Sequence, residues 1–202
     1  EIFADPKTRD SGNTILGKFF PGGSLNISGA NSPSSLASKP IRILLCDEID
    51  RYPDSAGGEG DPISLAEKRT TTYWNRLVAK FSTPTSKGAS RIEDEYALGT
   101  QEEWQHQCPN CKEFHLLSHI NMKCGYTQKI DKKKVKHVHV KSVAWVCPDC
   151  GFSFSEQTMK QQPQKYVAQN PEARQEGRRS FHVNGFTFPW ICLLYTSDAA
   201  DE

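Results

Sequence analysis

Apolar and polar positions in the first hundred residues are grouped into short strand-like and helix-like segments. Residues 41–46 form a mostly apolar run that is typical of a strand buried on both faces of a parallel sheet. Residues 76–82 predict a second strand. Between them, Asp61 and Pro62 are typical of an N-cap with proline at the first helical position, which predicts a helix over residues 62–73. This order of segments indicates an α/β fold.

The composition changes after Gly99, where we expect a module boundary. Before it, Ser90 predicts the N-cap of a helix that runs to Leu98, with Gly99 as its stop signal. Residues 100–155 contain short aromatic and β-branched runs, which predict small β hairpins. The chain is therefore expected to hold a core over residues 1–99 and an inserted module over residues 100–155.

Residues 156–191 are expected to lead from the module back to the core. A short helix is predicted over residues 155–162, and the apolar alternation over residues 181–188 predicts an extended segment that returns to the main sheet. Residues 192–202 resemble the translation of a sequencing-library adaptor, so we expect them to lie outside the fold. A genuine amphipathic tail is the alternative. Because the chain starts at Glu1, we also expect upstream sequence to be missing.

Charge is informative only locally. The 25 Lys and Arg residues nearly balance the 24 Asp and Glu residues, so the net charge selects no class of partner. Between Lys123 and Lys141, however, seven lysines accompany a single acid, Asp131. The central lysines of this stretch are candidates for contacts with nucleic-acid phosphates, and a solvated loop is the alternative: Lys132, Lys133 and Lys134.

The chain contains no apolar run long enough to cross a bilayer and no secretory signal pattern, so we expect an intracellular protein without a membrane partner.

The strand predicted over residues 41–46 leads directly into two acids, Asp47 and Glu48. An apolar strand that delivers acids to its carboxyl end fits a Walker B element, because ligands bind beyond that end in open α/β sheets. In this interpretation Asp47 holds Mg²⁺ through water, and Glu48 orients the water that attacks ATP. The alternative is an ordinary strand that ends in a solvated Asp-Glu turn.

A second pattern resembles a phosphate-binding loop but lacks features that such a loop requires. The segment from Gly12 to Lys18 has the glycine and lysine spacing of a phosphate-binding loop, but Phe19 stands where the Mg²⁺-binding Ser or Thr belongs. No strand pattern precedes Gly12, and Pro21 breaks the helix that should follow. We therefore expect the true phosphate loop upstream of this sequence.

Two C-P-x-C pairs give the most specific spacing signal in the chain. They consist of Cys108 with Cys111 and of Cys147 with Cys150. Each pair can place two thiolates on one turn, and four thiolates complete a tetrahedral structural Zn²⁺ site. A redox motif would require one pair at the start of a helix, which two similar pairs do not fit. Cys124 and His115 are interpreted as bystanders.

Several motifs taken together resemble the GpA-like family of phage terminase large subunits. They are residues 31–38 (NSPSSLAS), 45–50 (LCDEID), 60–67 (GDPISLAE), 82–88 (STPTSKG), 90–92 (SRI) and the two cysteine pairs.

This resemblance implies a partial P-loop ATPase sheet of the additional-strand type over residues 1–99, with a small zinc-ribbon-like β insertion. Asp47 and Glu48 would be its Walker B acids, with ATP and Mg²⁺ as cofactors. The coupling motif, which passes the nucleotide state to DNA-gripping elements, would consist of Ser82, Thr83, Pro84 and Thr85.

The resemblance also implies an ATP-driven motor that packages double-stranded viral DNA into procapsids in the host cytoplasm. The expected partners are viral DNA, a small terminase subunit, the portal of the procapsid and further copies in a ring. A nuclease domain that cuts DNA would follow the present sequence. Two alternatives stay open: a DEAD-like helicase or another nucleic-acid-stimulated ATPase, and a non-enzymatic zinc-ribbon that binds nucleic acid.

Overall fold

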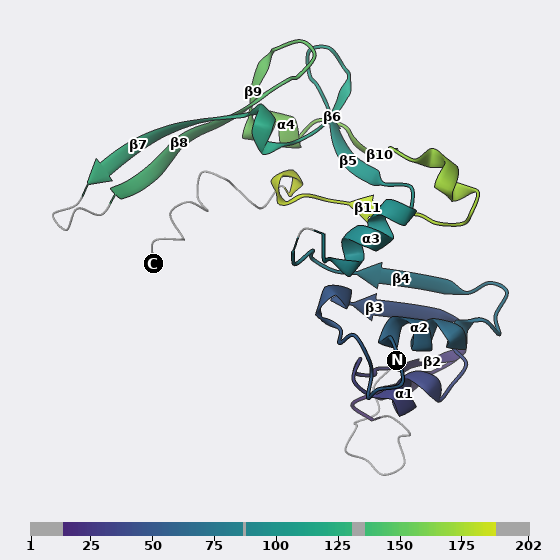
Figure 1. Ribbon diagram of the computed structural model, residues 1–202. Helices are drawn as coiled ribbons and strands as arrows, with labels where there is room; N and C mark the ends of the chain where they lie inside the picture. Colours follow the sequence, from purple (N-terminus) through teal and green to yellow (C-terminus); the bar gives the residue numbers. More distant parts are fainter. Residues whose placement is uncertain (1–13, 87, 131–135, 189–202) are drawn as a thin grey trace. The chain divides into compact units, whose positions relative to one another are not determined.

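The computed structural model describes residues 14–86, 88–130 and 136–188 of the chain (Figure 1). Two compact units, Glu1–Glu93 and Asp94–Glu202, make up a mixed α/β protein with several small sheets. The boundary falls inside helix α3 (Arg91–Leu98), a few residues before the predicted boundary at Gly99. Helix α3 itself matches the helix predicted from Ser90 to Leu98. No helix in the described ranges is long and apolar enough to span a membrane.

Some predictions concern residues outside the described part of the chain. They are the phosphate-contacting role of Lys132, Lys133 and Lys134, the start of the rejected phosphate-loop pattern at Gly12, and the adaptor-like residues 192–202.

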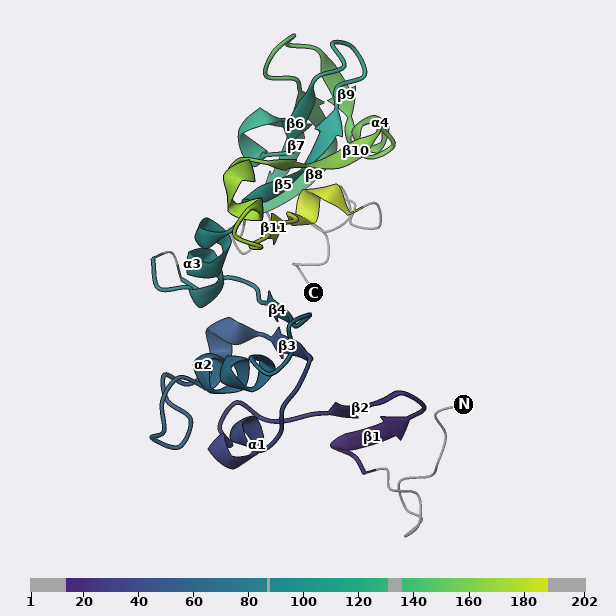
Figure 2. The ribbon, with the colours of Figure 1, turned by 90° about the vertical axis from the view of Figure 1, so that its right-hand side faces the viewer.

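The first unit combines a hairpin, a parallel strand pair and short helices. The regular elements of this unit are β1 (Gly17–Phe20), β2 (Gly23–Asn26), α1 (Pro33–Ala37), β3 (Ile43–Asp47), the 3-10 helix η1 (Ile49–Arg51), α2 (Pro62–Glu67), the 3-10 helix η2 (Lys68–Thr70) and β4 (Leu77–Phe81). Strands β1 and β2 form the antiparallel hairpin that Figure 2 shows.

Strands β3 and β4 overlap the two predicted strands and pair in parallel, from Ile43 opposite Leu77 to Asp47 opposite Phe81. One face packs against a small core in which Cys46, Ile49 and Ile63 are buried. Residues of α2 lie close to β3 on this side.

No element in the described part of the chain covers the opposite face of the β3–β4 pair, which is called the open face below. Its apolar side chains are between 49% and 60% exposed: Ile43, Leu45, Leu77 and Phe81. The prediction that the first strand is buried on both faces is therefore wrong for the described residues. The physical reason is that α2 covers one face of a two-stranded sheet and no described element covers the other.

Helix α2 begins where the sequence predicts and ends earlier. The Oδ2 atom of Asp61 accepts a hydrogen bond from the backbone N of Ser64 at 2.8 Å, which is the expected N-cap contact. The helix ends at Glu67 and continues only as the short η2, rather than to residue 73. Thr70 contributes to this early end, because its hydroxyl donates to the carbonyl of Glu67 at 2.8 Å and β-branched residues disfavour continued helix.

The second unit holds the β hairpins predicted for residues 100–155. One sheet is centred on β5 (Glu102–Gln107), which pairs antiparallel with β10 (Gln164–Ala168) and β6 (Phe114–Leu116). A second sheet contains β7 (Met122–Ile130), β8 (Lys136–Val146) and β9 (Ser153–Ser155). The remaining elements are η3 (His119–Asn121), α4 (Glu156–Lys160), η4 (Pro171–Arg174), β11 (Phe181–His182) and η5 (Gly185–Thr187).

The core of this unit lies between strand β8 and helix α4. Leu117, Trp145 and Met159 are buried there and pack with partly buried aromatic residues. Helix α4 confirms the short helix predicted near residue 155, because Ser155 is its N-cap and accepts a hydrogen bond from the backbone N of Thr158.

The predicted return of residues 181–188 to the sheet of β3 and β4 is wrong. Strand β11 covers only Phe181–His182 and pairs in parallel with β5 of the second unit. Ser180 fixes this position, because its hydroxyl donates to the carbonyl of Tyr96 at 2.8 Å and accepts from the backbone N of Gln101 at 2.8 Å. The 3-10 helix η5 then ends the extended segment.

Candidate functional site

The acid pair and the Ser82–Thr85 segment leave the first sheet at the same edge. Because β3 and β4 run in parallel, residues that follow their carboxyl ends lie side by side. Asp47 is the last residue of β3 and lies opposite Phe81, the last residue of β4. The structure thus brings together the two segments that the sequence singled out in the core.

Glu48 has an unusual backbone conformation directly after Asp47. Its φ of 55° and ψ of 48° lie in the left-handed region, which costs free energy for any residue with a Cβ atom. The turn lets Ile49 point into the core, where it is fully buried, while Asp47 and Glu48 stay exposed. The Glu48 carboxylate accepts a hydrogen bond from Arg51 Nε at 3.2 Å. Both side chains of this ion pair are substantially exposed, so it contributes little to stability.

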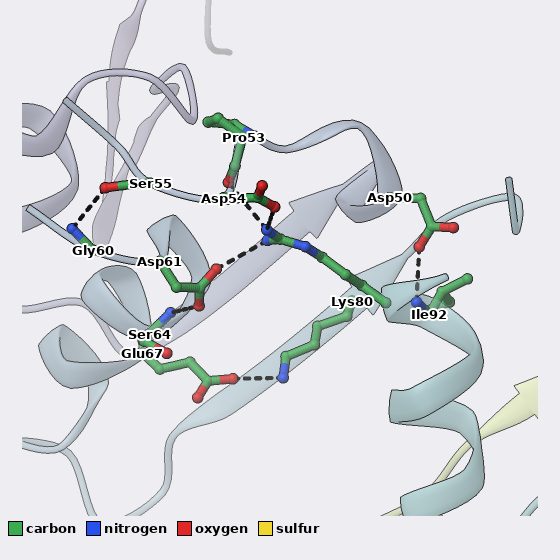
Figure 3. Close-up of polar contacts among 11 residues, drawn as sticks. Asp50, Pro53, Asp54, Ser55, Gly60, Asp61, Ser64, Glu67, Lys80 and Ile92 are labelled. Carbon is green, nitrogen blue, oxygen red and sulfur yellow. Dashed lines mark hydrogen bonds and ion pairs between the residues drawn. The ribbon is translucent and has the colours of Figure 1, made fainter. Parts of the chain in front are cut away.

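Asp50 is the most highly connected carboxylate of this edge, and sequence reasoning missed it. Its Oδ2 accepts hydrogen bonds from the backbone N and the hydroxyl of Thr85, at 2.9 and 3.1 Å. Its Oδ1 accepts from the backbone N of Ile92 at 2.8 Å (Figure 3). The backbone N of Asp50 donates to the hydroxyl of Ser82 at 3.2 Å.

These contacts set the protonation state of Asp50. Desolvation raises the pKa of this carboxyl, but hydrogen bonds from Ser90, Ile92 and Thr85 outweigh it and lower the pKa to about 2. Hydrogen bonds to the charged form favour ionisation, so Asp50 is a carboxylate at neutral pH.

Arg91 joins the start of α3 to the loop before α2. Its Nη1 donates to Asp61 Oδ1 at 2.9 Å, and its Nη2 donates to the carbonyl of Pro53 at 3.1 Å and to Asp54 Oδ1 at 3.2 Å. Asp61 therefore bonds both to Arg91 and to the first turn of α2. Figure 3 shows its bond to Ser64 of α2 and the ion pair between Lys80 and Glu67. The loop and both helix starts form one polar network in the first unit.

The four cysteines of the C-P-x-C pairs converge in the second unit. Their Sγ atoms all lie within 4.8 Å of one another, and they form the one group of potential metal ligands found among the described residues. Between the pairs, Cys108 lies 3.8 Å from Cys150 and Cys111 lies 3.6 Å from Cys147, Sγ to Sγ. In a tetrahedral site with Zn–S bonds of about 2.3 Å, neighbouring sulfurs are about 3.8 Å apart. The geometry fits such a site.

The two cysteine turns share one backbone pattern. Cys108 N donates to the carbonyl of Glu113, and Lys112 N donates back to the carbonyl of Cys108. In the second turn Cys147 N donates to the carbonyl of Phe152, and Gly151 N donates to the carbonyl of Cys147. The residue four positions after the first cysteine is left-handed in both turns, with φ of 67° at Lys112 and 69° at Gly151.

The thiols of the cluster do not ionise alike. Hydrogen bonds from the Asn110 side chain and the Phe152 backbone N lower the pKa of Cys150 to about 6. For Cys111, the hydrogen bond from Glu113 N lowers the pKa, but burial and the neighbouring thiols outweigh it and raise the pKa to about 12. All four groups would become thiolates together only with a cation among them, which a bound divalent metal would supply.

The two bystanders of the sequence analysis stay outside the cluster. Cys124 is exposed on β7 and does not belong to the group of converging sulfurs. His115 lies on β6, with its Nε2 3.6 Å from Asp149 Oδ2, and it is not part of the group either.

A comparison with known protein families gives a match over most of the chain. A family model described as "Phage terminase large subunit gpA, ATPase domain" matches residues 1–168 of the 202-residue chain. Searches of curated proteins and of solved structures found no match. The family match covers both the Asp47–Glu48 edge and the cysteine cluster. The chain therefore belongs to the gpA family of phage terminase large subunits, through their ATPase domain.

Proposed function

We propose that this chain is a fragment of the ATP-driven motor that packages double-stranded viral DNA into procapsids. The observation that carries the proposal is the placement of Asp47 and Glu48 at the carboxyl end of β3, beside the loop that follows the parallel strand β4. The family match supports an ATPase.

The exposed carboxylates at this edge are suited to Mg²⁺, which prefers oxygen ligands and keeps several waters. When bound, Mg²⁺ would supply positive charge to offset the charge that develops on the transferred phosphoryl group. Asp47 would hold the ion through water. Glu48 would accept a hydrogen bond from the attacking water and orient it, after release from its exposed contact with Arg51.

The second unit is proposed to be a zinc-ribbon-like insertion whose metal is structural. Four sulfurs converge from two turns, which leaves no open position for a substrate if all four bind one Zn²⁺. Bound Zn²⁺ would connect two hairpins that share only a small apolar core.

The complete protein is proposed to act with the partners of a packaging motor in the host cytoplasm. The proposed partners are viral DNA, a small terminase subunit, the portal and further copies in a ring. The proposal also includes a nuclease activity of the complete protein, which cuts the DNA. The phosphate contacts of Lys132, Lys133 and Lys134 stay a prediction.

The catalytic proposal is tested in the complete large subunit that contains this sequence. Glu48→Gln should retain ATP binding and lose hydrolysis by roughly 100-fold or more, because an amide cannot act as a base. Asp47→Asn should weaken Mg²⁺-dependent binding. Glu59→Gln, a change at an exposed acid before α2, is the matched control and should hydrolyse ATP normally. Full turnover by the Glu48→Gln protein would remove Glu48 from catalysis.

The metal proposal is tested on the chain itself by metal analysis. We expect one zinc ion per chain. Cys147→Ser should lose that ion and the protease resistance of the second unit, whereas Cys124→Ser should keep both, because Cys124 lies outside the sulfur cluster. A metal-free chain with the same protease resistance would rule out the site.

A further inference from the structure

We propose that Asp50 is a positioning residue that links the loop of the acid pair to the Ser82–Thr85 loop and to the first turn of α3. Through this link, a displacement of Glu48 during the ATPase cycle moves both neighbouring segments. The inference rests on the proposed function, because it assumes that Asp47 and Glu48 act on nucleotide.

Asp50 makes its contacts across long distances in the sequence. Thr85 is 35 residues away from Asp50, and Ile92 is 42 residues away. Each carboxylate oxygen serves a different segment: Oδ2 binds the loop after β4, and Oδ1 binds the start of α3. A single side chain thus joins three segments of the first unit.

Only a carboxylate fits this arrangement. All the groups that face its two oxygens are donors: two backbone N–H groups and the hydroxyls of Thr85 and Ser90. An asparagine side chain has one oxygen and one NH₂ group, so in either orientation it places a donor against another donor. Asp50→Asn therefore removes one side of the link while it preserves size.

A simple helix-capping role does not account for Asp50. Helix α3 already has a local N-terminal contact, because the backbone N of Glu93 donates to the hydroxyl of Ser90 at 3.3 Å. This contact is the usual N-cap arrangement. The bond from Ile92 N to Asp50 is an additional bond that comes from a different part of the unit.

Asp50 lies close enough to Asp47 and Glu48 in the sequence for a movement of these two acids to reach it. Only Ile49 separates it from Glu48, and Ile49 is fully buried in the core with Cys46 and Ile63. Backbone hydrogen bonds hold this short turn together, from Arg51 N to the carbonyl of Glu48 at 2.9 Å and from Tyr52 N to the carbonyl of Ile49 at 3.2 Å, so a displacement of Glu48 is carried to Asp50. Its hydrogen bonds pass the shift to Thr85 and Ile92.

The experiment compares Asp50→Asn with Asp94→Asn, an exposed carboxylate on α3, in the complete large subunit. ATP hydrolysis is measured with and without linear double-stranded DNA, together with the Kd for an ATP analogue and the thermal midpoint. We expect Asp50→Asn to reduce the stimulation by DNA roughly tenfold, within the usual range of coupling between sites, while the Kd is largely preserved. Asp94→Asn should leave the stimulation unchanged.

A merely structural role gives a different result. Loss of folded protein lowers hydrolysis with and without DNA by the same factor, so the ratio stays constant. An unchanged ratio in Asp50→Asn overturns the inference. If Asp50→Asn does not fold, Thr85→Val is used instead, since it removes only the hydroxyl bond and should lower the ratio in the same direction. An unchanged ratio in Thr85→Val then overturns the inference.

Hydrogen exchange supplies a readout that does not depend on turnover. In Asp50→Asn without nucleotide, either the amide of Thr85 or that of Ile92 should exchange faster than in Asp94→Asn, because the two amides donate to different oxygens of Asp50 and asparagine keeps only one of them. Unchanged exchange at both amides also contradicts the inference. Glu48→Gln separates the two proposals. If the Glu48→Gln protein still hydrolyses ATP, the proposed function fails. If it does not hydrolyse ATP and the stimulation of Asp50→Asn by DNA is unchanged, only the proposed link through Asp50 fails.

Discussion

Left-handed backbone at residues other than glycine marks both candidate sites. Among the described residues, Glu48, Gln101 and Lys112 have positive φ angles. Glu48 belongs to the acid pair, and Lys112 closes the first cysteine turn. Such conformations persist only where the surrounding contacts require them, and they are frequent at functional sites.

The two cysteine turns allow a direct test of backbone strain. Gly151→Ala should destabilise the second unit by about 1–2 kcal/mol, because alanine disfavours the left-handed conformation at φ 69° although nothing lies within 4 Å of the added Cβ. Lys112→Gly should be neutral or stabilise the unit by up to about 1 kcal/mol for the same reason. Gly185→Ala, which also meets no neighbour within 4 Å and has no positive φ, is the control.

Urea unfolding of the metal-loaded variants measures these differences. An equal effect of Gly151→Ala and Gly185→Ala would show that the left-handed conformation is not what matters at Gly151.

The sequence predicts site residues well where the signal is local. The cysteine pairs are recognisable because both ligands of a turn lie three residues apart, and the acid pair is recognisable because an apolar strand precedes it. Asp50 has no such signal, since its partners Thr85 and Ile92 lie on segments that only the fold brings near. Its role could not be predicted before the loops were placed in space.

Helix starts follow the sequence more closely than helix ends in this chain. Asp61 is an N-cap as predicted, and Ser155, at which a short helix was predicted to begin, is the N-cap of α4, since one side chain and a nearby backbone N–H decide each contact. The end of α2 depends instead on competing threonine hydroxyl bonds, which the helix pattern does not reveal. The prediction for strand β11 failed because its partner β5 is far away in the sequence. Ser180, directly before β11, holds this pairing through a hydrogen bond to the carbonyl of Tyr96, 84 residues away.

The cap of α2 also carries a tertiary contact, and two variants separate these roles. Asp61→Ser keeps an oxygen for the backbone N of Ser64 but loses the contact with Arg91. Asp61→Ala loses both, so it should be less stable than Asp61→Ser by about 1 kcal/mol, the usual contribution of a cap. Chemical denaturation with a probe in the first unit measures the difference. Equal stability of the two variants would mean that the cap contributes nothing.

Among the described residues, each unit contains one carboxyl group whose pKa is lowered to about 2. In the second unit, hydrogen bonds from Arg179 lower the pKa of Glu102 to about 2, in spite of the opposing effect of burial, and Thr100 and Arg174 add to the shift. In the first unit the pKa of Asp50 is also about 2. Protonation of either group in acid removes stabilising contacts.

Acid should therefore weaken both units in the same pH range. A lowered pKa contributes stability that is fully present above the unfolded value, 3.8 for Asp50 and 4.5 for Glu102, and this stability is lost as the pH falls through about 2. Glu102→Gln should destabilise the second unit at pH 7, and its difference from the wild type should shrink between about pH 4.5 and 2. Thermal unfolding across this range tests the prediction. A difference that does not depend on pH would contradict it.

The open face of the β3–β4 pair has a practical consequence for work with this chain. Four large apolar side chains on one sheet face are about half exposed: Ile43, Leu45, Leu77 and Phe81. A contiguous apolar surface of this kind favours association between molecules, and salts such as sulfate strengthen the effect. The formal net charge of +1 provides almost no repulsion to oppose it. This sheet face should therefore lower the solubility of the chain, an effect that the overall composition does not reveal.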